Sequence, residues 1–168
     1  PLRVWLKLDT GMNRLGFRTE EFAAAHARLG RIRGVESPPL LVTHLANADE
    51  RADPMTVAQL ERFAAATAGF TGERSIANSA GILAWPAARA DWVRPGLMLY
   101  GIAPYPGTTG SDFGLRPAMT LESEVIAVRT VQSGESVGYR ALWRAGRASR
   151  IAIVACGYGD GYPRATAA

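Results

Sequence analysis

The feature that most constrains the fold of this chain is a change in its pattern at about residue 100. Before that point, short β-prone apolar runs alternate with helical segments. Strands and helices are expected in turn, beginning and ending with a strand, over residues 3–9, 20–29, 40–44, 54–68, 75–77, 79–83 and 92–94. Strict alternation of this kind is typical of βα units around a parallel sheet.

After residue 100 the helical pattern disappears. Residues 104–114 are rich in Pro, Gly, Ser and Thr, and three strand-like segments follow at residues 118–132, 136–143 and 150–157. We therefore expect an α/β domain over residues 1–103, a linker over residues 104–117 and a β-rich domain over residues 118–168.

Polar side chains collect where the expected strands end. They are Lys7 and Asp9 with Arg14 just beyond, then His44, then Asn78 and Ser79, and finally Arg94. In parallel α/β folds, chemistry gathers at the carboxyl edge of the sheet. Singly, His44 has an ordinary explanation as a structural hydrogen-bonding residue and Ser79 as a helix cap. Their joint placement favours a functional site.

Ser79 and the Pro95-Gly96-Leu97 turn suggest a phosphate site. A helix N-terminus with a serine hydroxyl offers hydrogen bonds to a phosphate, and Gly96 allows a backbone to approach closely. A capped helix and a tight turn explain the same residues equally well.

The composition narrows the function classes. The net charge is +4, but the basic residues are spread along the chain, which argues against a nucleic-acid surface. Cys156 is the only cysteine and lies in an apolar run, so we expect it to be buried and inert. No apolar stretch has the length of a membrane span and no signal-peptide pattern is present, which favours a cytoplasmic protein. We expect no metal site.

The two ends of the chain and its single lysine bear on how complete a site can be. The sequence opens inside an expected strand without an initiator methionine and ends soon after another, so we expect a fragment. Lys7 is the only lysine, and any reaction that needs a lysine amine has one candidate here.

Six segments, in this order and spacing, resemble the alanine racemase family. They are KLDTGMNRLG at residues 7–16, THLANADE at 43–50, ANSAG at 77–81, VRPGLMLYG at 93–101, VGY at 137–139 and GYGDGYPR at 157–164. The resemblance covers essentially the whole chain. It implies the later half of a (β/α)8 TIM-type barrel, then the start of a C-terminal β-domain, in a homodimer that uses pyridoxal 5'-phosphate.

The resemblance assigns cofactor contacts to particular residues. Arg94 is similar to the arginine that faces the pyridine nitrogen, and His44 to the histidine that backs the ring and supports that arginine. A guanidinium is not deprotonated in proteins, so it transfers no proton to the pyridine nitrogen. That nitrogen stays unprotonated, and side reactions such as transamination are disfavoured. The residues similar to the lining of the ring and phosphate are Asn78, Ser79, Gly96 and Leu97.

Arg14 resembles the arginine near the cofactor's phenolic oxygen and the substrate carboxylate, which its fork geometry suits. As the sole lysine, Lys7 would be the first choice for the Schiff base. The resemblance instead matches Lys7 to a lysine that orients the equivalent of Arg14 and is carbamylated in some members. It places the Schiff-base lysine upstream of Pro1.

Tyr139 resembles the tyrosine that acts as the second base, reaching in from the partner subunit. Racemisation needs one acid/base group on each face of a planar intermediate. Here Arg140 follows it, where many members have glycine; without the flanking motifs, a cross-strand aromatic would be the favoured interpretation. The residues similar to the corridor through which substrate enters are Asp49, Tyr158 and Arg164. We interpret Asp160 as structural.

These expectations combine into one function with several alternatives. The full-length parent is expected to interconvert L-alanine and D-alanine and so supply D-alanine for peptidoglycan. A broad-specificity or serine racemase is the first alternative, and a pyridoxal-phosphate decarboxylase with a related barrel is less favoured. The 168-residue chain alone is expected to be inactive, as an inert fragment or a weak binder, because the Schiff-base lysine lies upstream.

Overall fold

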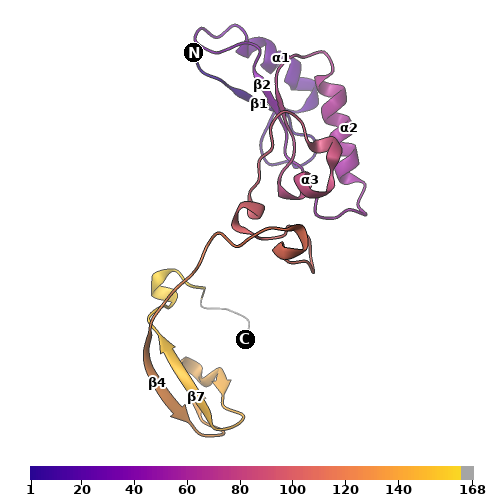
Figure 1. Cartoon of the computed structure of the whole chain (residues 1–168). Coiled ribbons are helices and arrows are strands. Elements are labelled where there is room, and N and C mark those ends of the chain that lie inside the picture. The colour runs from indigo at the N-terminus through magenta and orange to yellow at the C-terminus, as the bar shows by residue number, and fades with distance from the viewer. Residues whose placement is uncertain (164–168) are drawn as a thin grey trace. The chain divides into compact units, whose positions relative to one another are not determined.

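The computed structural model describes residues 1–163 and divides the chain into two compact units, Pro1–Met119 and Thr120–Ala168. Unit 1 contains the expected alternation of strands and helices, and unit 2 is built from strands and short turns (Figure 1). No helix among the described residues is long and apolar enough to cross a membrane.

Unit 1 is organised around a three-stranded parallel sheet in the order β1-β2-β3. The strands are β1 (Trp5–Lys7), β2 (Leu40–Val42) and β3 (Arg74–Ser75). Leu6 pairs with Leu41, and Val42 with Ser75. Because the strands are parallel and in neighbouring positions, the residues that follow them meet at one edge of the sheet.

Three α-helices alternate with these strands: α1 (Thr19–Leu29), α2 (Met55–Thr67) and α3 (Ser79–Ala84). In Figure 1, α1 and α2 lie on the same side of β1 and β2. Each buries one phenylalanine, Phe22 from α1 and Phe63 from α2, in the core with Leu6, Leu8 and Leu41. Burying each such ring contributes about 1.5–3 kcal/mol.

The ends of α1 and α2 are fixed by local hydrogen bonds. Glu21 in the first turn of α1 accepts from the Arg18 amide at 3.1 Å, and an acidic side chain there also suits the helix dipole. Asp53 accepts from the Met55 amide at 2.7 Å at the start of α2. The Gly30 amide closes α1 on the carbonyl of His26 at 3.2 Å.

The strand expected at residues 92–94 is wrong. Trp92 makes only an isolated bridge to Ser75. The Trp92 amide donates to Arg74 O and the Arg94 amide to Ala77 O, both at 3.0 Å. Pro95 follows immediately and has no amide hydrogen, so the ladder cannot continue. The segment still places Arg94 beside the end of β3.

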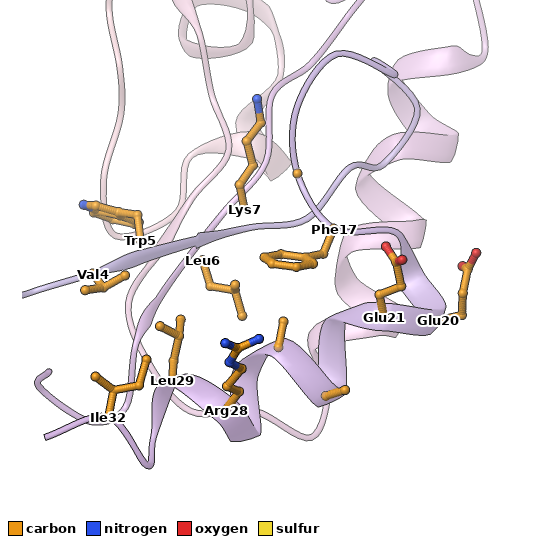
Figure 2. A pocket seen from close by; sticks show the side chains of 13 residues that line it. Val4, Trp5, Leu6, Lys7, Phe17, Glu20, Glu21, Arg28, Leu29 and Ile32 are labelled. Atoms are coloured by element: carbon orange, nitrogen blue, oxygen red, sulfur yellow. The ribbon is translucent and has the colours of Figure 1, made fainter.

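The outer side of β1 forms a groove with α1, with a volume of about 890 Å³. Figure 2 shows Leu6, Leu29 and Ile32 on one side of β1, while Lys7 points to the opposite side. This alternation is what an extended strand imposes. Among the described residues, β1 pairs as a strand with β2 alone, although Phe17 bridges to Leu8 beyond it.

Residues 104–117 pack within unit 1. Tyr105 is buried, and its hydroxyl donates to Ala80 O at 2.7 Å. A 3-10 turn, Gly110–Phe113, follows. Tyr105 and Phe113 lie with their ring centroids 5.4 Å apart. The segment is therefore held to the core by side chains that its Pro/Gly-rich composition does not reveal.

Unit 2 contains two antiparallel pairs. The longer pair joins β4 (Val125–Val131) to β7 (Ser149–Val154), and the shorter joins β5 (Ser136–Val137) to β6 (Trp143–Arg144). The expected strand over residues 136–143 is wrong, because a 3-10 turn at Tyr139–Ala141 interrupts it. Arg140 has φ +64° in that turn, a left-handed conformation that no strand accommodates. The strand expected over residues 118–132 is reduced to β4.

Candidate active site

Arg94 is the centre of a cluster at the carboxyl edge of the parallel sheet. Its Nη2 donates to Thr43 O at 2.6 Å and more weakly to Ile76 O at 3.4 Å. Its Nη1 donates to Ser75 Oγ at 2.5 Å. These acceptors belong to the ends of β2 and β3, so the guanidinium joins two neighbouring strands. Burial lowers the pKa of Arg94, but a guanidinium stays charged in proteins.

His44 lies against the same guanidinium, with its Nδ1 3.3 Å from Arg94 Nη2. Arginine can only donate, so Nδ1 must accept, and the imidazole is neutral with its proton on Nε2. Burial lowers the pKa of His44, and the charges of Arg94, Lys7 and Arg14 lower it further. Geometry and electrostatics agree on a neutral His44.

Lys7 and Arg14 add positive charge to this edge. The pKa of Lys7 is lowered first by burial and then by Arg14 and Arg94, while Asp9 opposes these effects. Asp9 is held locally, because its Oδ1 accepts from the Gly11 amide at 3.0 Å and the Asn13 amide at 3.1 Å. Burial raises the pKa of Asp9, but the amides of Gly11, Asn13 and Met12 and the charge of Lys7 together lower it by more. The edge therefore offers cationic groups to an anionic ligand.

Ser79 and the turn after Arg94 form a second part of the edge. Ser79 Oγ accepts from the Gly96 amide at 2.9 Å and the Met98 amide at 3.3 Å. A hydroxyl that accepts two hydrogen bonds still has its own proton to donate. Leu97 lies between the two amides and is exposed.

The interpretation of Ser79 as the cap of α3 is wrong, because Asn78 has that role. Asn78 Oδ1 accepts from the Gly81 amide at 3.0 Å, and its Nδ2 donates to Leu45 O at 3.1 Å. Asn78 therefore fixes the start of α3 against the loop after β2. The Ser79 hydroxyl remains directed to the 96–98 turn.

Ser75 and Thr43 belong to the cluster, although the sequence did not single them out. Ser75 Oγ accepts from Arg94 and donates to Trp92 O at 3.1 Å. Thr43 supplies a main-chain carbonyl, which no side-chain pattern reveals. For Thr43 the available signal was its position near the carboxyl end of the strand expected over residues 40–44. Ser75 was expected to begin a strand over residues 75–77, and only the structure places it at the end of β3.

The remaining candidate residues lie elsewhere. Asp49 is exposed in the loop after β2, near Arg51, whose guanidinium lies 4.6 Å from the centroid of the Tyr105 ring. Tyr139 and Tyr158 belong to unit 2, with 78% and 66% of their surfaces exposed. Arg164 lies outside the described residues. Over residues 1–163, no group of three His, Cys, Asp or Glu side chains is arranged to hold a metal ion.

Comparisons with known proteins cover both units. Residues 1–104 match the family described as alanine racemase, N-terminal domain, and residues 118–168 match the alanine racemase C-terminal domain. An alanine racemase from Shewanella amazonensis is 52% identical over 98% of this chain and 45% of its own length. One from Aeromonas hydrophila is 50% identical over 98% of this chain and 46% of its own.

The solved structures that match this chain are also alanine racemases. The crystal structure of a biosynthetic alanine racemase from Pseudomonas aeruginosa matches with a TM-score of 0.89 and 51% identity, over 98% of this chain and 46% of that one. One from Streptomyces coelicolor has a TM-score of 0.86 and 38% identity, over 98% of this chain and 45% of that chain. The architecture is a partial TIM barrel followed by a β-domain. The chain spans about half the length of the relatives it matches.

Proposed function

Because the chain belongs to the alanine racemase family, we propose that the protein containing it interconverts L-alanine and D-alanine in the cytoplasm. We propose pyridoxal 5'-phosphate as its cofactor and the supply of D-alanine for peptidoglycan as its role. The observation that carries the proposal is the position of Arg94, held at the sheet edge by Thr43 O and Ser75 beside a neutral His44.

The cluster fits the pyridine ring of this cofactor. Arg94 has a permanent charge and directed N–H groups, so it could donate a hydrogen bond to a ring nitrogen without giving up a proton. Bound pyridoxal phosphate supplies a carbonyl carbon for the substrate amine and a ring that withdraws electrons from the substrate Cα. With an unprotonated nitrogen that withdrawal is weakened, which disfavours transamination. His44 keeps Arg94 in place because its Nδ1 accepts from the guanidinium.

Ser79 and its turn fit the phosphate. The Ser79 hydroxyl keeps a proton to donate after accepting from the Gly96 and Met98 amides. Gly96 and Leu97 line the same turn. Asn78 holds the beginning of α3 beside the loop after β2.

Arg14 and Lys7 fit the substrate side. The Arg14 fork suits a carboxylate, and Lys7 shares the same electrostatic environment, as the effect of Arg14 on the Lys7 pKa shows. We assign Arg14 to the substrate carboxylate and the cofactor's phenolic oxygen. Lys7 positions Arg14, and the cofactor is anchored by another lysine.

Tyr139 is assigned as one of two bases. Its hydroxyl returns or removes the proton at the substrate Cα on one face, while a lysine outside this chain acts on the other face. The exposure of Tyr139 suits a side chain that acts in a partner subunit of a homodimer. Asp49, Tyr158 and Arg164 are assigned to the corridor through which substrate enters.

The isolated 168-residue chain is proposed to be inactive. Lys7 is its only lysine, so no second lysine is present to anchor the cofactor. The groove along β1 and α1 supports the same view, because it leaves apolar side chains available to further barrel segments.

The proposal is tested by purifying the complete protein with pyridoxal phosphate and measuring D-alanine formed from L-alanine with D-amino-acid oxidase. L-serine is assayed in parallel to separate an alanine racemase from a broad-specificity one. We expect D-alanine to form from L-alanine, this activity to be lost in Arg94→Met, and no D-alanine from the 168-residue chain. A complete protein that binds the cofactor yet racemises neither substrate contradicts the proposal.

A further inference from the structure

A buried glutamine on α2 joins the segments that follow β1 and β2. Gln59 has no exposed surface. Its Nε2 donates to Thr10 Oγ1 at 3.0 Å and to His44 O at 3.1 Å, and its Oε1 accepts from the Ala46 amide at 2.8 Å. These bonds use three of the four hydrogen bonds that a side-chain amide can make. They also fix which amide atom is the oxygen.

The direction of each hydrogen bond in this network follows from its neighbours. The Thr43 hydroxyl donates to Leu8 O at 2.9 Å, so its single proton is already used. In the 2.8 Å contact between the hydroxyls of Thr10 and Thr43, Thr10 must therefore be the donor. Thr10 in turn accepts from Gln59. The donors run in one direction, from Gln59 through Thr10 and Thr43 to the main chain after β1.

The network reaches Arg94 through two adjacent residues. Arg94 donates to the carbonyl of Thr43 and lies against the ring of His44. Gln59 holds the carbonyl of His44, and the Thr43 side chain is tied to Thr10. A displacement of this segment would move both the carbonyl and the imidazole that place the guanidinium.

Helix α2 is fixed to the same loop at a second point. The Arg62 guanidinium, three residues beyond Gln59 and on the same helix face, donates to Thr10 O. A buried amide is costly unless its hydrogen bonds are satisfied, and packing alone is served as well by an apolar side chain. Gln59 is fully buried and hydrogen-bonds the residues that follow two strands. Its presence is therefore better explained by the geometry that these bonds impose than by packing.

We infer that Gln59 is a positioning residue for cofactor binding, which fixes the ends of β1 and β2 so that Arg94 and His44 present one arrangement to the pyridine ring. The inference rests on the proposed function for the identity of the ligand. Gln59 touches neither cofactor nor substrate in this account, and it acts through Thr10, Thr43 and His44.

The test compares two substitutions on α2 in the complete protein. Gln59→Met keeps the length of the side chain and removes every hydrogen bond. Thr67→Val is the matched control, because Thr67 is equally buried and its hydroxyl donates to Phe63 O within the same helix at 2.7 Å. Two quantities are measured: the Kd of pyridoxal phosphate for the apo protein, and the pH dependence of the bound cofactor's absorption.

We expect Gln59→Met to weaken cofactor binding on the order of 10- to 100-fold, as misplaced groups in active sites do. We also expect it to change the pH dependence of the absorption, because Arg94 no longer has one fixed position. Thr67→Val should change neither quantity, although it lowers stability. Gln59→Glu keeps the acceptor for the Ala46 amide but loses both donors. It should therefore weaken cofactor binding about as much as Gln59→Met does.

Thr10→Val breaks the same network at the next residue and should weaken binding in the same way, including where Gln59→Met fails to fold. The double variant with Gln59→Met and Thr10→Val should lose no more affinity for pyridoxal phosphate than Gln59→Met alone, because the two residues act in series. Equal effects of Gln59→Met and Thr67→Val on both quantities would overturn the inference, as would additive losses in the double variant. Failure of the unsubstituted protein to bind the cofactor would instead refute the proposed function, and the inference with it.

Discussion

Three buried threonines allow the contribution of hydroxyl hydrogen bonds to stability to be tested by one substitution, Thr→Val. Thr43, Thr56 and Thr67 are each no more than 1% exposed. Thr→Val keeps the shape of the side chain and replaces the hydroxyl with a methyl group. Thr56 and Thr67 lie on α2, where threonine and valine have similar helix propensities. The three positions differ chiefly in what the hydroxyl contacts.

The structure predicts that the change in the free energy of unfolding differs in sign or size among the three substitutions. The Thr56 hydroxyl has no hydrogen-bond partner among the described residues, so Thr56→Val should raise the free energy of unfolding by about 1–2 kcal/mol. The Thr67 hydroxyl donates to Phe63 O, and Thr67→Val should lower it by about 1 kcal/mol. Thr43→Val removes two bonds and leaves Leu8 O and the proton of the Thr10 hydroxyl unpaired, which should cost about 2–4 kcal/mol.

Urea denaturation followed by tryptophan fluorescence measures all three variants, since Trp5, Trp85 and Trp92 lie in unit 1. Equal denaturant slopes across the series would show that the free energies are comparable. The expected order of stability is Thr56→Val, unsubstituted protein, Thr67→Val, Thr43→Val. If Thr56→Val destabilised the protein as much as Thr43→Val, burial alone would decide the cost and the network argument would be refuted.

Three further outcomes are expected. Ser79→Ala removes the acceptor of the Gly96 and Met98 amides and should weaken pyridoxal phosphate binding by about tenfold or more, while Ser79→Thr retains most affinity; titration of the apo protein decides. Burial lowers the pKa of His26 below 6.5, and its Nε2 has no partner among the described residues, so protonation favours unfolding. Stability should therefore be complete above pH 6.5 and fall as the pH drops below it, and His26→Met should flatten that dependence in urea titrations at pH 5 and pH 8. Arg140 has φ +64°, a left-handed conformation that glycine adopts at lower cost than other residues. In thermal denaturation, Arg140→Gly should therefore raise the free energy of unfolding of unit 2 by up to about 1 kcal/mol, and Arg140→Val should lower it.

The sequence predicted the helices of unit 1 better than its short strands. The two longer helices were expected at residues 20–29 and 54–68, and α1 and α2 have nearly these bounds, because Gly30 and Pro54 mark their ends and apolar spacing marks their buried faces. The segments at residues 92–94 and 136–143 were misassigned. Their β-prone residues compete with a following proline in one case and left-handed residues in the other, and only the pairing partner decides the outcome.

Part of the candidate site followed from strand order alone. Polar residues at the ends of parallel strands were expected to converge, and His44 and Arg94 lie in contact. Ser75, Thr43 and Gln59 were not predicted, because their importance depends on a carbonyl or hydroxyl of a neighbouring strand that sequence spacing does not reveal. The roles of Arg14, Lys7 and Tyr139 rest on family resemblance and stay predictions.

We propose that this edge of the sheet binds the cofactor with Arg94 against the pyridine nitrogen, supported by a neutral His44. The ¹⁵N chemical shift of that nitrogen, in the complete protein loaded with ¹⁵N-labelled pyridoxal phosphate, tests this directly. Because a guanidinium gives up no proton, we expect the shift of an unprotonated nitrogen between pH 6 and pH 9. A shift typical of a protonated pyridinium over that range would contradict it.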